Sequence, residues 1–261
     1  YPMVNEHFDG NWGLYDEPFL KYMVSEISRH PQPFFSLVFT ISTHQPYHVP
    51  EIYSGKFKKG TMKIHESVRY VDYAVEQFFK EAEKQPWFKN TLFIITADHT
   101  QMSESEFYNM PLGRFMVPVL IYHPGIDWDK SERLSAPVDT ERIVQQTDIL
   151  PTVIDFVGAP IPAKGLLRFG RSIFDQKNAG EAILHQNGNY WLVKDRHFLQ
   201  YTPGVEQALL FDLGADLDQK NPLAGDDFKP LREAYIKKTQ AYIQYFQNGL
   251  IDRKLYVPLK E

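Results

Sequence analysis

The stretch Thr91-Leu92-Phe93-Ile94-Ile95-Thr96-Ala97-Asp98-His99-Thr100 carries the most information about the fold. Its first seven residues are apolar or β-prone, and the run then stops at an acid and an imidazole. An apolar run without polar alternation predicts a central strand, buried on both faces, of an α/β sheet. Ligand sites in such sheets lie beyond the carboxyl ends of the strands, which is where Asp98 and His99 fall.

This acid and imidazole are candidate metal ligands. Carboxylate and neutral imidazole commonly bind zinc and manganese-type ions. Adjacent residues on a regular strand point to opposite faces, so Asp98 and His99 can reach one ion only where the backbone turns. A metal site normally needs three or four ligands, and the others must come from elsewhere. The alternative is that Asp98 caps the next segment and His99 only packs.

A second apolar run, residues 34–41, predicts another buried strand. It also ends in polar residues, from Ser42 to His48. His44 in this polar loop is the second candidate for the site, with a structural or solvated histidine as the alternative. Two helix–strand units thus each deliver a histidine to the end of a strand. This alternation predicts an α/β fold with a doubly wound, mostly parallel sheet.

Helical periodicity supports the same organisation. Apolar spacing predicts amphipathic helices over residues 17–29, with Asp16 as the N-cap, and over residues 62–83. Residues 149–157 form a short helix that ends at Gly158. Residues 116–122 predict a third strand, at an edge or a bulge because it contains Pro118.

The pattern of apolar residues changes near residue 180. Short apolar runs follow one another, at residues 182–185, 190–193, 197–201 and 208–212, and Asn187-Gly188 favours a tight hairpin turn. A helical pattern closes the chain over residues 228–247. We therefore expect a division into residues 1–178, which hold the α/β core, and residues 179–261, which form a small antiparallel sheet and a closing helix.

Composition excludes several classes of protein. Of the 261 residues, 43% are hydrophobic and 23% are charged, as in ordinary globular domains. The net charge of −5 argues against a nucleic-acid surface, which needs clustered Lys and Arg. Cysteine is absent, so no disulfide forms. The sequence shows neither a nucleophile setting nor a phosphate-binding glycine loop.

The order of the motifs resembles the sulfatase family of the alkaline phosphatase superfamily, and within it the lipoteichoic acid synthase and phosphoglycerol transferase-like members. The resemblance runs over nearly all of the chain. The matching segments are residues 12–19, 39–47, 67–72, 91–99, 117–122, 146–158, 170–174 and 210–223. Thr100 stands where the family commonly has glycine, and Phe211 stands where tyrosine is more usual.

The resemblance implies a function for the candidate residues. Asp98 and His99 would supply two ligands of a catalytic divalent metal, with manganese, zinc, magnesium and calcium left open. His44 would bind the phosphate or head group of an anionic phospho- or sulfo-ester. The reaction would be phosphoglycerol-type transfer or ester hydrolysis, and the metal would act as a Lewis acid.

The family's nucleophile and its other metal-binding acid lie upstream of the first motif present here. The chain starts at Tyr1 rather than at Met, so we expect a C-terminal part of the catalytic domain that is inactive alone. We also expect a membrane-anchored, extracytoplasmic parent protein and self-association through an exposed sheet edge. The rival hypotheses are a non-catalytic module that binds anionic polymers and a purely structural domain.

Overall fold

The computed structural model describes residues 4–128, 139–160, 169–175, 179–205 and 207–255. Helices and strands alternate along them in an α/β fold. The chain divides into two compact units, one made of residues 1–93 and 121–125 and the other of residues 94–120 and 126–261. The predicted division at residue 178 stays a prediction.

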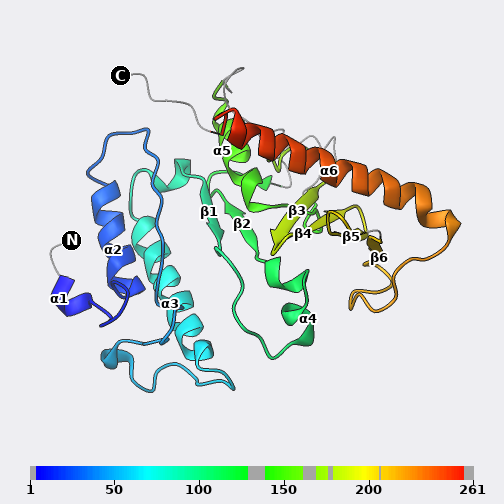
Figure 1. Cartoon of the computed structure of the whole chain (residues 1–261). Helices are drawn as coiled ribbons and strands as arrows, with labels where there is room; N and C mark the ends of the chain where they lie inside the picture. The colour runs from blue at the N-terminus through cyan, green and yellow to red at the C-terminus, as the bar shows by residue number, and fades with distance from the viewer. Residues whose placement is uncertain (1–3, 129–138, 161–168, 176–178, 206, 256–261) are drawn as a thin grey trace. The chain divides into compact units, whose positions relative to one another are not determined.

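Two amphipathic helices organise the first unit. Helices α2 (Asp16–Ile27) and α3 (Ile64–Ala82) lie side by side, close to the predicted ranges (Figure 1). Their facing apolar residues form one core, made of Leu20, Val24, Ile27, Ala74, Phe78, Ala82, Trp87 and Phe88. The unit also contains helix α1 (Val4–His7) and the 3-10 turns η1 (Glu51–Tyr53) and η2 (Phe88–Asn90).

Two short strands correspond to two of the predicted runs. Strand β1 (Phe93–Thr96) pairs with strand β2 (Val119–Tyr122) in a two-stranded sheet. The prediction that β1 is buried on both faces is wrong, because Ile95 is 39% exposed and Thr96 is also exposed. Among the described residues β1 has only β2 as a neighbour, so one side of the strand is not covered by another strand.

The predicted strand over residues 34–41 does not form in the described structure. The segment keeps the alternation of a strand, since Phe34 and Val38 pack against the core of the first unit. Its other face is bare: Phe35 is 82%, Leu37 84% and Phe39 66% exposed. A strand needs a hydrogen-bonded neighbour, and no described segment pairs with these residues.

The second unit contains the predicted antiparallel sheet. Strands β3 (Glu181–Gln186), β4 (Asn189–Lys194), β5 (His197–Tyr201) and β6 (Leu209–Asp212) follow one another as a meander. The β3–β4 turn uses Asn187 and Gly188, with φ of 52° and 79°. Positive φ at both positions is what a two-residue hairpin turn of this twist requires, so the Asn-Gly signal is confirmed.

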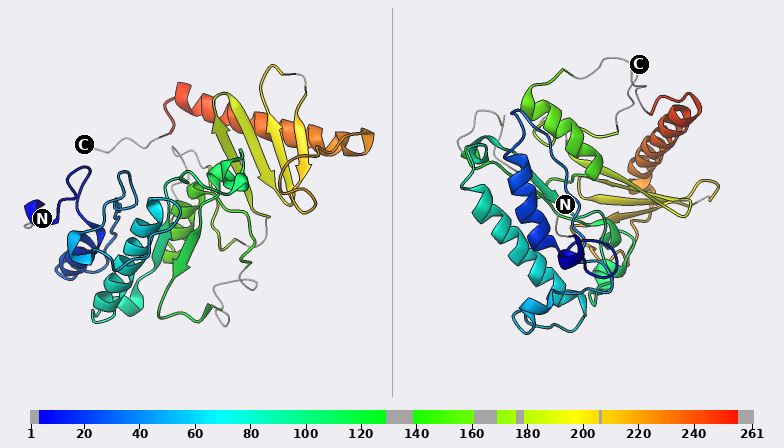
Figure 2. Two further views of the ribbon diagram at one scale, coloured as in Figure 1. Left: turned by 90° about the horizontal axis from the view of Figure 1, so that it is seen from below. Right: turned by 90° about the vertical axis from the view of Figure 1, so that its left-hand side faces the viewer.

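Both faces of this sheet are covered. On one face Trp191, Val193, Phe198 and Phe211 form an apolar cluster. On the other face Leu192, Leu199 and Leu210 pack against Tyr235 of helix α6 (Lys229–Ile251). Figure 2 shows α6 lying along the sheet. This alternation explains why consecutive residues are buried in the middle of each strand, Trp191 to Val193 in β4 and Phe198 with Leu199 in β5.

The remaining elements of the second unit are short. They are helices α4 (Glu106–Asn109) and α5 (Ile149–Val157) and the 3-10 turns η3 (Gly113–Phe115), η5 (Gln146–Asp148) and η6 (Asp226–Phe228). Gly158 ends α5 in the left-handed conformation, as predicted. Among the helices of the described residues, none is long and apolar enough to cross a membrane.

Candidate functional site

The backbone turns directly after β1, and this turn brings the two candidate ligands together. Asp98 Oδ2 and His99 Nε2 lie 3.5 Å apart. Metal–ligand bonds to carboxylate oxygen and imidazole nitrogen are about 2.0–2.2 Å long, so two atoms at this separation can bind the same ion. The side chains are 54% and 60% exposed, which leaves that ion accessible to a substrate.

Local hydrogen bonds orient both side chains. The His99 backbone N–H donates to Asp98 Oδ1 at 2.9 Å, which fixes one carboxylate oxygen and leaves Oδ2 facing the imidazole. His99 Nδ1 lies 2.8 Å from the Thr100 carbonyl oxygen. Because a carbonyl only accepts, Nδ1 carries the proton and Nε2 keeps its lone pair. This is the arrangement found in metal-binding histidines.

Gln146 supports the turn from outside, and sequence reasoning missed it. Its side-chain Nε2 donates to the carbonyl oxygens of Ala97 at 2.7 Å and Asp98 at 3.1 Å. Thr100 Oγ1 donates to the Arg114 carbonyl at 2.6 Å and holds the far side of the turn. The only signal in the sequence was the polar start of the helix at residues 146–148, which does not indicate a long-range contact.

The donor set in the described residues is incomplete. No group of three or more His, Cys, Asp or Glu side chains in the described ranges is arranged to hold a metal ion. Asp98 and His99 fit two positions of a divalent metal site by donor type and separation.

His44 is placed by a tight loop in the first unit. Its backbone N–H donates to the Ile41 carbonyl at 2.8 Å, and its carbonyl accepts from Tyr47 N–H at 2.8 Å. His44 Nδ1 donates to the Gln45 carbonyl at 2.9 Å, and the Trp12 ring lies 4.5 Å from the imidazole. In the neutral imidazole, Nε2 is then the acceptor nitrogen.

Asp16 anchors this loop. The predicted N-cap role is wrong, because Asp16 is the first helical residue and Tyr15 occupies the N-cap position. Asp16 is 1% exposed, and its Oδ1 instead accepts from the backbone N–H groups of Ile41 at 2.9 Å and Ser42 at 3.1 Å. Burial raises the pKa of the Asp16 carboxyl, while these two N–H groups oppose the shift.

Two further acids, Asp72 and Asp148, differ in their surroundings. Asp72 is exposed on α3. Asp148 is buried and forms a capping box with Gln145, whose backbone N–H donates to Asp148 Oδ2 at 3.0 Å. It also accepts from the Arg171 backbone N–H at 2.8 Å. Burial raises the pKa of Asp148, and the hydrogen bonds lower it in part.

Comparison with known proteins identifies the family of this chain. The profile described as Sulfatase matches residues 2–159. Lipoteichoic acid synthase 2 of Bacillus subtilis (strain 168) is 25% identical over 210 residues, which cover 73% of this chain and 30% of that protein. The chain thus spans about a third of the length of such curated relatives.

Solved structures give the same result. A protein of the alkaline phosphatase superfamily from Vibrio parahaemolyticus matches with a TM-score of 0.74 and 25% identity, over 96% of this chain and 58% of that one. The lipoteichoic acid synthase LtaP from Listeria monocytogenes matches with a TM-score of 0.61 and 16% identity, over 91% and 60%. This chain therefore belongs to the sulfatase family, with the α/β fold of the alkaline phosphatase superfamily and with lipoteichoic acid synthases among its relatives.

Proposed function

We propose that this chain supplies part of the catalytic site of a divalent metal-dependent enzyme that transfers or hydrolyses phospho- or sulfo-esters, with phosphoglycerol-type transfer as the preferred reaction. The observation that carries the proposal is the 3.5 Å separation of Asp98 Oδ2 and His99 Nε2 on the turn after β1. Family membership supports it, because the matching family is described as Sulfatase and the named relatives include lipoteichoic acid synthases.

Each candidate residue has a defined role in this proposal. Asp98 and His99 would hold the metal, which when bound supplies Lewis acidity at the ester oxygens. His44 would bind the anionic group of the substrate, with its Nδ1–H fixed on Gln45 and its Nε2 turned to the ester once protonated. Gln146 would keep the Asp98 backbone in place. The nucleophile and the other ligands would come from a part of the protein outside this sequence.

The exposed face of residues 34–41 supports a further partner. Phe35, Leu37 and Phe39 expose three large apolar side chains on one side of an extended segment. Exposed apolar surface of this kind pairs with another chain segment. We propose that the rest of the catalytic domain covers this face, and that the isolated chain self-associates there. An extracytoplasmic location on a membrane-anchored protein belongs to the same proposal.

Turnover of an aryl phosphodiester or an aryl sulfate ester tests the proposal. The complete gene product should hydrolyse one of these probes, lose the activity with a chelator and regain it with Mn²⁺ or Zn²⁺. This chain alone should be inactive. A complete gene product that binds an anionic polymer but turns over neither ester would favour the non-catalytic binding module instead.

The orienting role of Gln146 gives a separate prediction. Gln146→Ala should weaken metal binding by the complete gene product about 10- to 100-fold, which is the usual cost of removing a residue that orients a ligand. The exposed Gln186 at the end of β3 offers a matched control, since Gln186→Ala should leave the affinity unchanged. Calorimetric titration measures both. Equal affinities of the two variants would remove Gln146 from the site.

A further inference from the structure

A groove lies beside helix α6 in the second unit, away from any residue used above as a ligand. It encloses about 410 Å³. Its walls combine the aromatic side chains of Phe169, Tyr242 and Tyr245 with the cations Arg171 and Lys238. This volume lies within the range of small-molecule sites, which are mostly apolar with a few placed polar groups.

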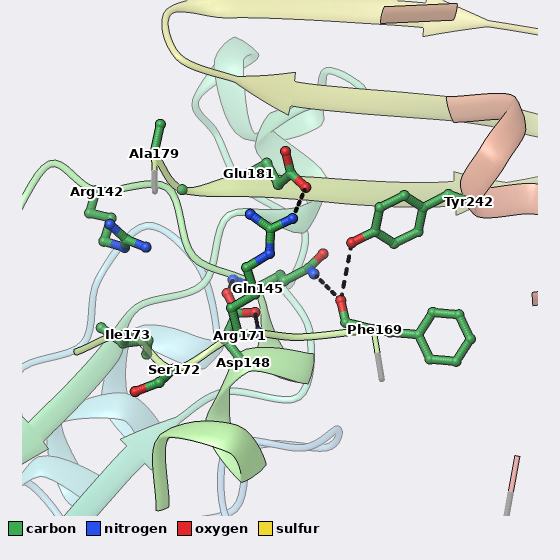
Figure 3. Close-up of a pocket in the computed structure, with 11 residues that line it drawn as sticks. Arg142, Gln145, Asp148, Phe169, Arg171, Ser172, Ile173, Ala179, Glu181 and Tyr242 are labelled. Atoms are coloured by element: carbon green, nitrogen blue, oxygen red, sulfur yellow. Dashed lines mark hydrogen bonds and ion pairs between the residues drawn. The ribbon is translucent and has the colours of Figure 1, made fainter. Parts of the chain in front are cut away.

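A buried carboxylate stands next to the groove. Glu181, the first residue of β3, has a side chain only 5% exposed. Three cations surround it: Lys238 Nζ at 2.9 Å, Arg171 at 3.4 Å and Lys194 Nζ at 3.9 Å. Figure 3 shows the Arg171 side chain directed at Glu181. Apart from these ion pairs, neither carboxylate oxygen has a hydrogen-bond donor among the described residues.

A small hollow lined by Glu181 lies next to the groove. The hollow shares Phe169, Arg171 and Tyr242 with the groove, and about 10 Å³ of it is open, room for one water or one hydroxyl group. Tyr242 Oη donates to the Phe169 carbonyl at 3.2 Å and the Gln145 side-chain amide donates to it at 3.0 Å, which keeps this wall in place.

The charges around the groove favour an anion. The cations are Arg142, Arg171, Lys194 and Lys238, and the acids are Asp148, Glu181 and Asp195. One positive charge is therefore in excess. Asp148 is already engaged by backbone N–H groups. Arg171 and Lys238 are 48% and 32% exposed, so their charged groups remain open to a ligand.

We propose that this groove binds a hydroxylated organic anion, a phosphate or sulfate ester of a polyol or sugar. Its anionic oxygens bind Arg171 and Lys238, and one hydroxyl donates to Glu181 through the hollow. Its carbon frame lies against Tyr245, whose ring packs edge-on to Phe169 at 5.3 Å. Binding of this anion does not depend on the proposed function. A role of the groove in holding a further unit of a polymeric substrate does rest on the proposed function.

Glycerol phosphate, inorganic phosphate and glycerol are the probes, titrated into this chain by calorimetry with a chelator present. The chelator removes any contribution from metal at Asp98 and His99. Glycerol phosphate should bind more tightly than either of the other two, because it alone meets the cations, the carboxylate and the aromatic wall. Equal binding of glycerol phosphate and inorganic phosphate would overturn the proposal.

Two variants locate the binding. Lys238→Glu should weaken glycerol phosphate binding by about tenfold or more, since it removes a charged partner. Lys237→Glu, at the exposed neighbouring position on α6, should not. Tyr245→Ala leaves the ion pairs intact and should weaken binding of glycerol phosphate but not of inorganic phosphate. Tyr108→Ala is its control, because Tyr108 is 42% exposed, as is Tyr245.

The outcomes separate this inference from the proposed function. Binding in the groove would be contradicted if the affinity for glycerol phosphate fell equally in Lys238→Glu and Lys237→Glu. It would also be contradicted if that affinity fell equally in Tyr245→Ala and Tyr108→Ala. The Asp98→Ala, His99→Ala double variant should bind glycerol phosphate as the unchanged chain does. If that variant loses ester turnover but still binds glycerol phosphate, binding in the groove is supported independently of the reaction that the enzyme catalyses.

Discussion

Alanine at both Asp98 and His99 should abolish ester turnover by the complete gene product and weaken its metal binding by more than about 100-fold. Removing a group that only orients a ligand costs about 10- to 100-fold, and removing two direct ligands costs more. Both atoms that would bind the ion, Asp98 Oδ2 and His99 Nε2, are lost together. Calorimetry gives the metal affinity, and release of an aryl leaving group gives the rate.

The control for this double variant also replaces one acid and one histidine, but at positions away from the candidate site. Asp218 and His185 are an exposed acid and an exposed imidazole in the second unit. Asp218→Ala, His185→Ala should therefore retain both metal binding and turnover. Folding of each variant is checked by its urea transition, since exposed positions should leave the unfolding midpoint unchanged. Retained metal affinity without Asp98 and His99 would show that other residues hold the ion.

Lysine at positions 37 and 39 is expected to convert a self-associating chain into a monomer. Leu37 and Phe39 are 84% and 66% exposed on the bare face of residues 34–41. Burying each side chain in an interface contributes about 1.5–3 kcal/mol. Their loss should therefore raise the dissociation constant by about 100-fold or more, since 1.4 kcal/mol corresponds to about tenfold. Sedimentation velocity over a range of concentrations measures the change.

Ile52→Lys is the matched control, because Ile52 is 82% exposed in η1 but lies outside this face. It should leave the association unchanged. Addition of the rest of the catalytic domain should also suppress self-association of the unchanged chain, because it competes for the same face. An unchanged chain that stays monomeric at high concentration would contradict the proposed interface.

The antiparallel sheet could be predicted from the sequence because its signals are local. Asn187-Gly188 specifies the turn, and the short apolar runs lie next to one another in the chain. The pairing of residues 34–41 could not be predicted in the same way. Apolar residues such as Leu37 indicate that a face of the segment is to be buried, but they do not identify the segment that packs against it.

The sequence predicts the chemistry of the candidate site but not the contacts that hold it in place. Asp98 and His99 stand out because polar groups end an apolar run. Asp16 and Gln146 do not, because each acts on backbone groups far away in sequence: Asp16 on Ile41, and Gln146 on Ala97 and Asp98. A polar residue at the start of a helix is usually explained by capping, which hides such long-range contacts.

Calorimetric titration of Mn²⁺ and Zn²⁺ into this chain and into the complete gene product distinguishes a metal site shared with residues outside this sequence from a site that this chain forms alone. In the shared site that we propose, Asp98 and His99 provide two of the ligands. Metal binding should be tight in the complete gene product, weak in this chain, and lost from both in the double alanine variant. Tight binding by this chain alone, or tight binding that survives the double variant, would rule out the shared site.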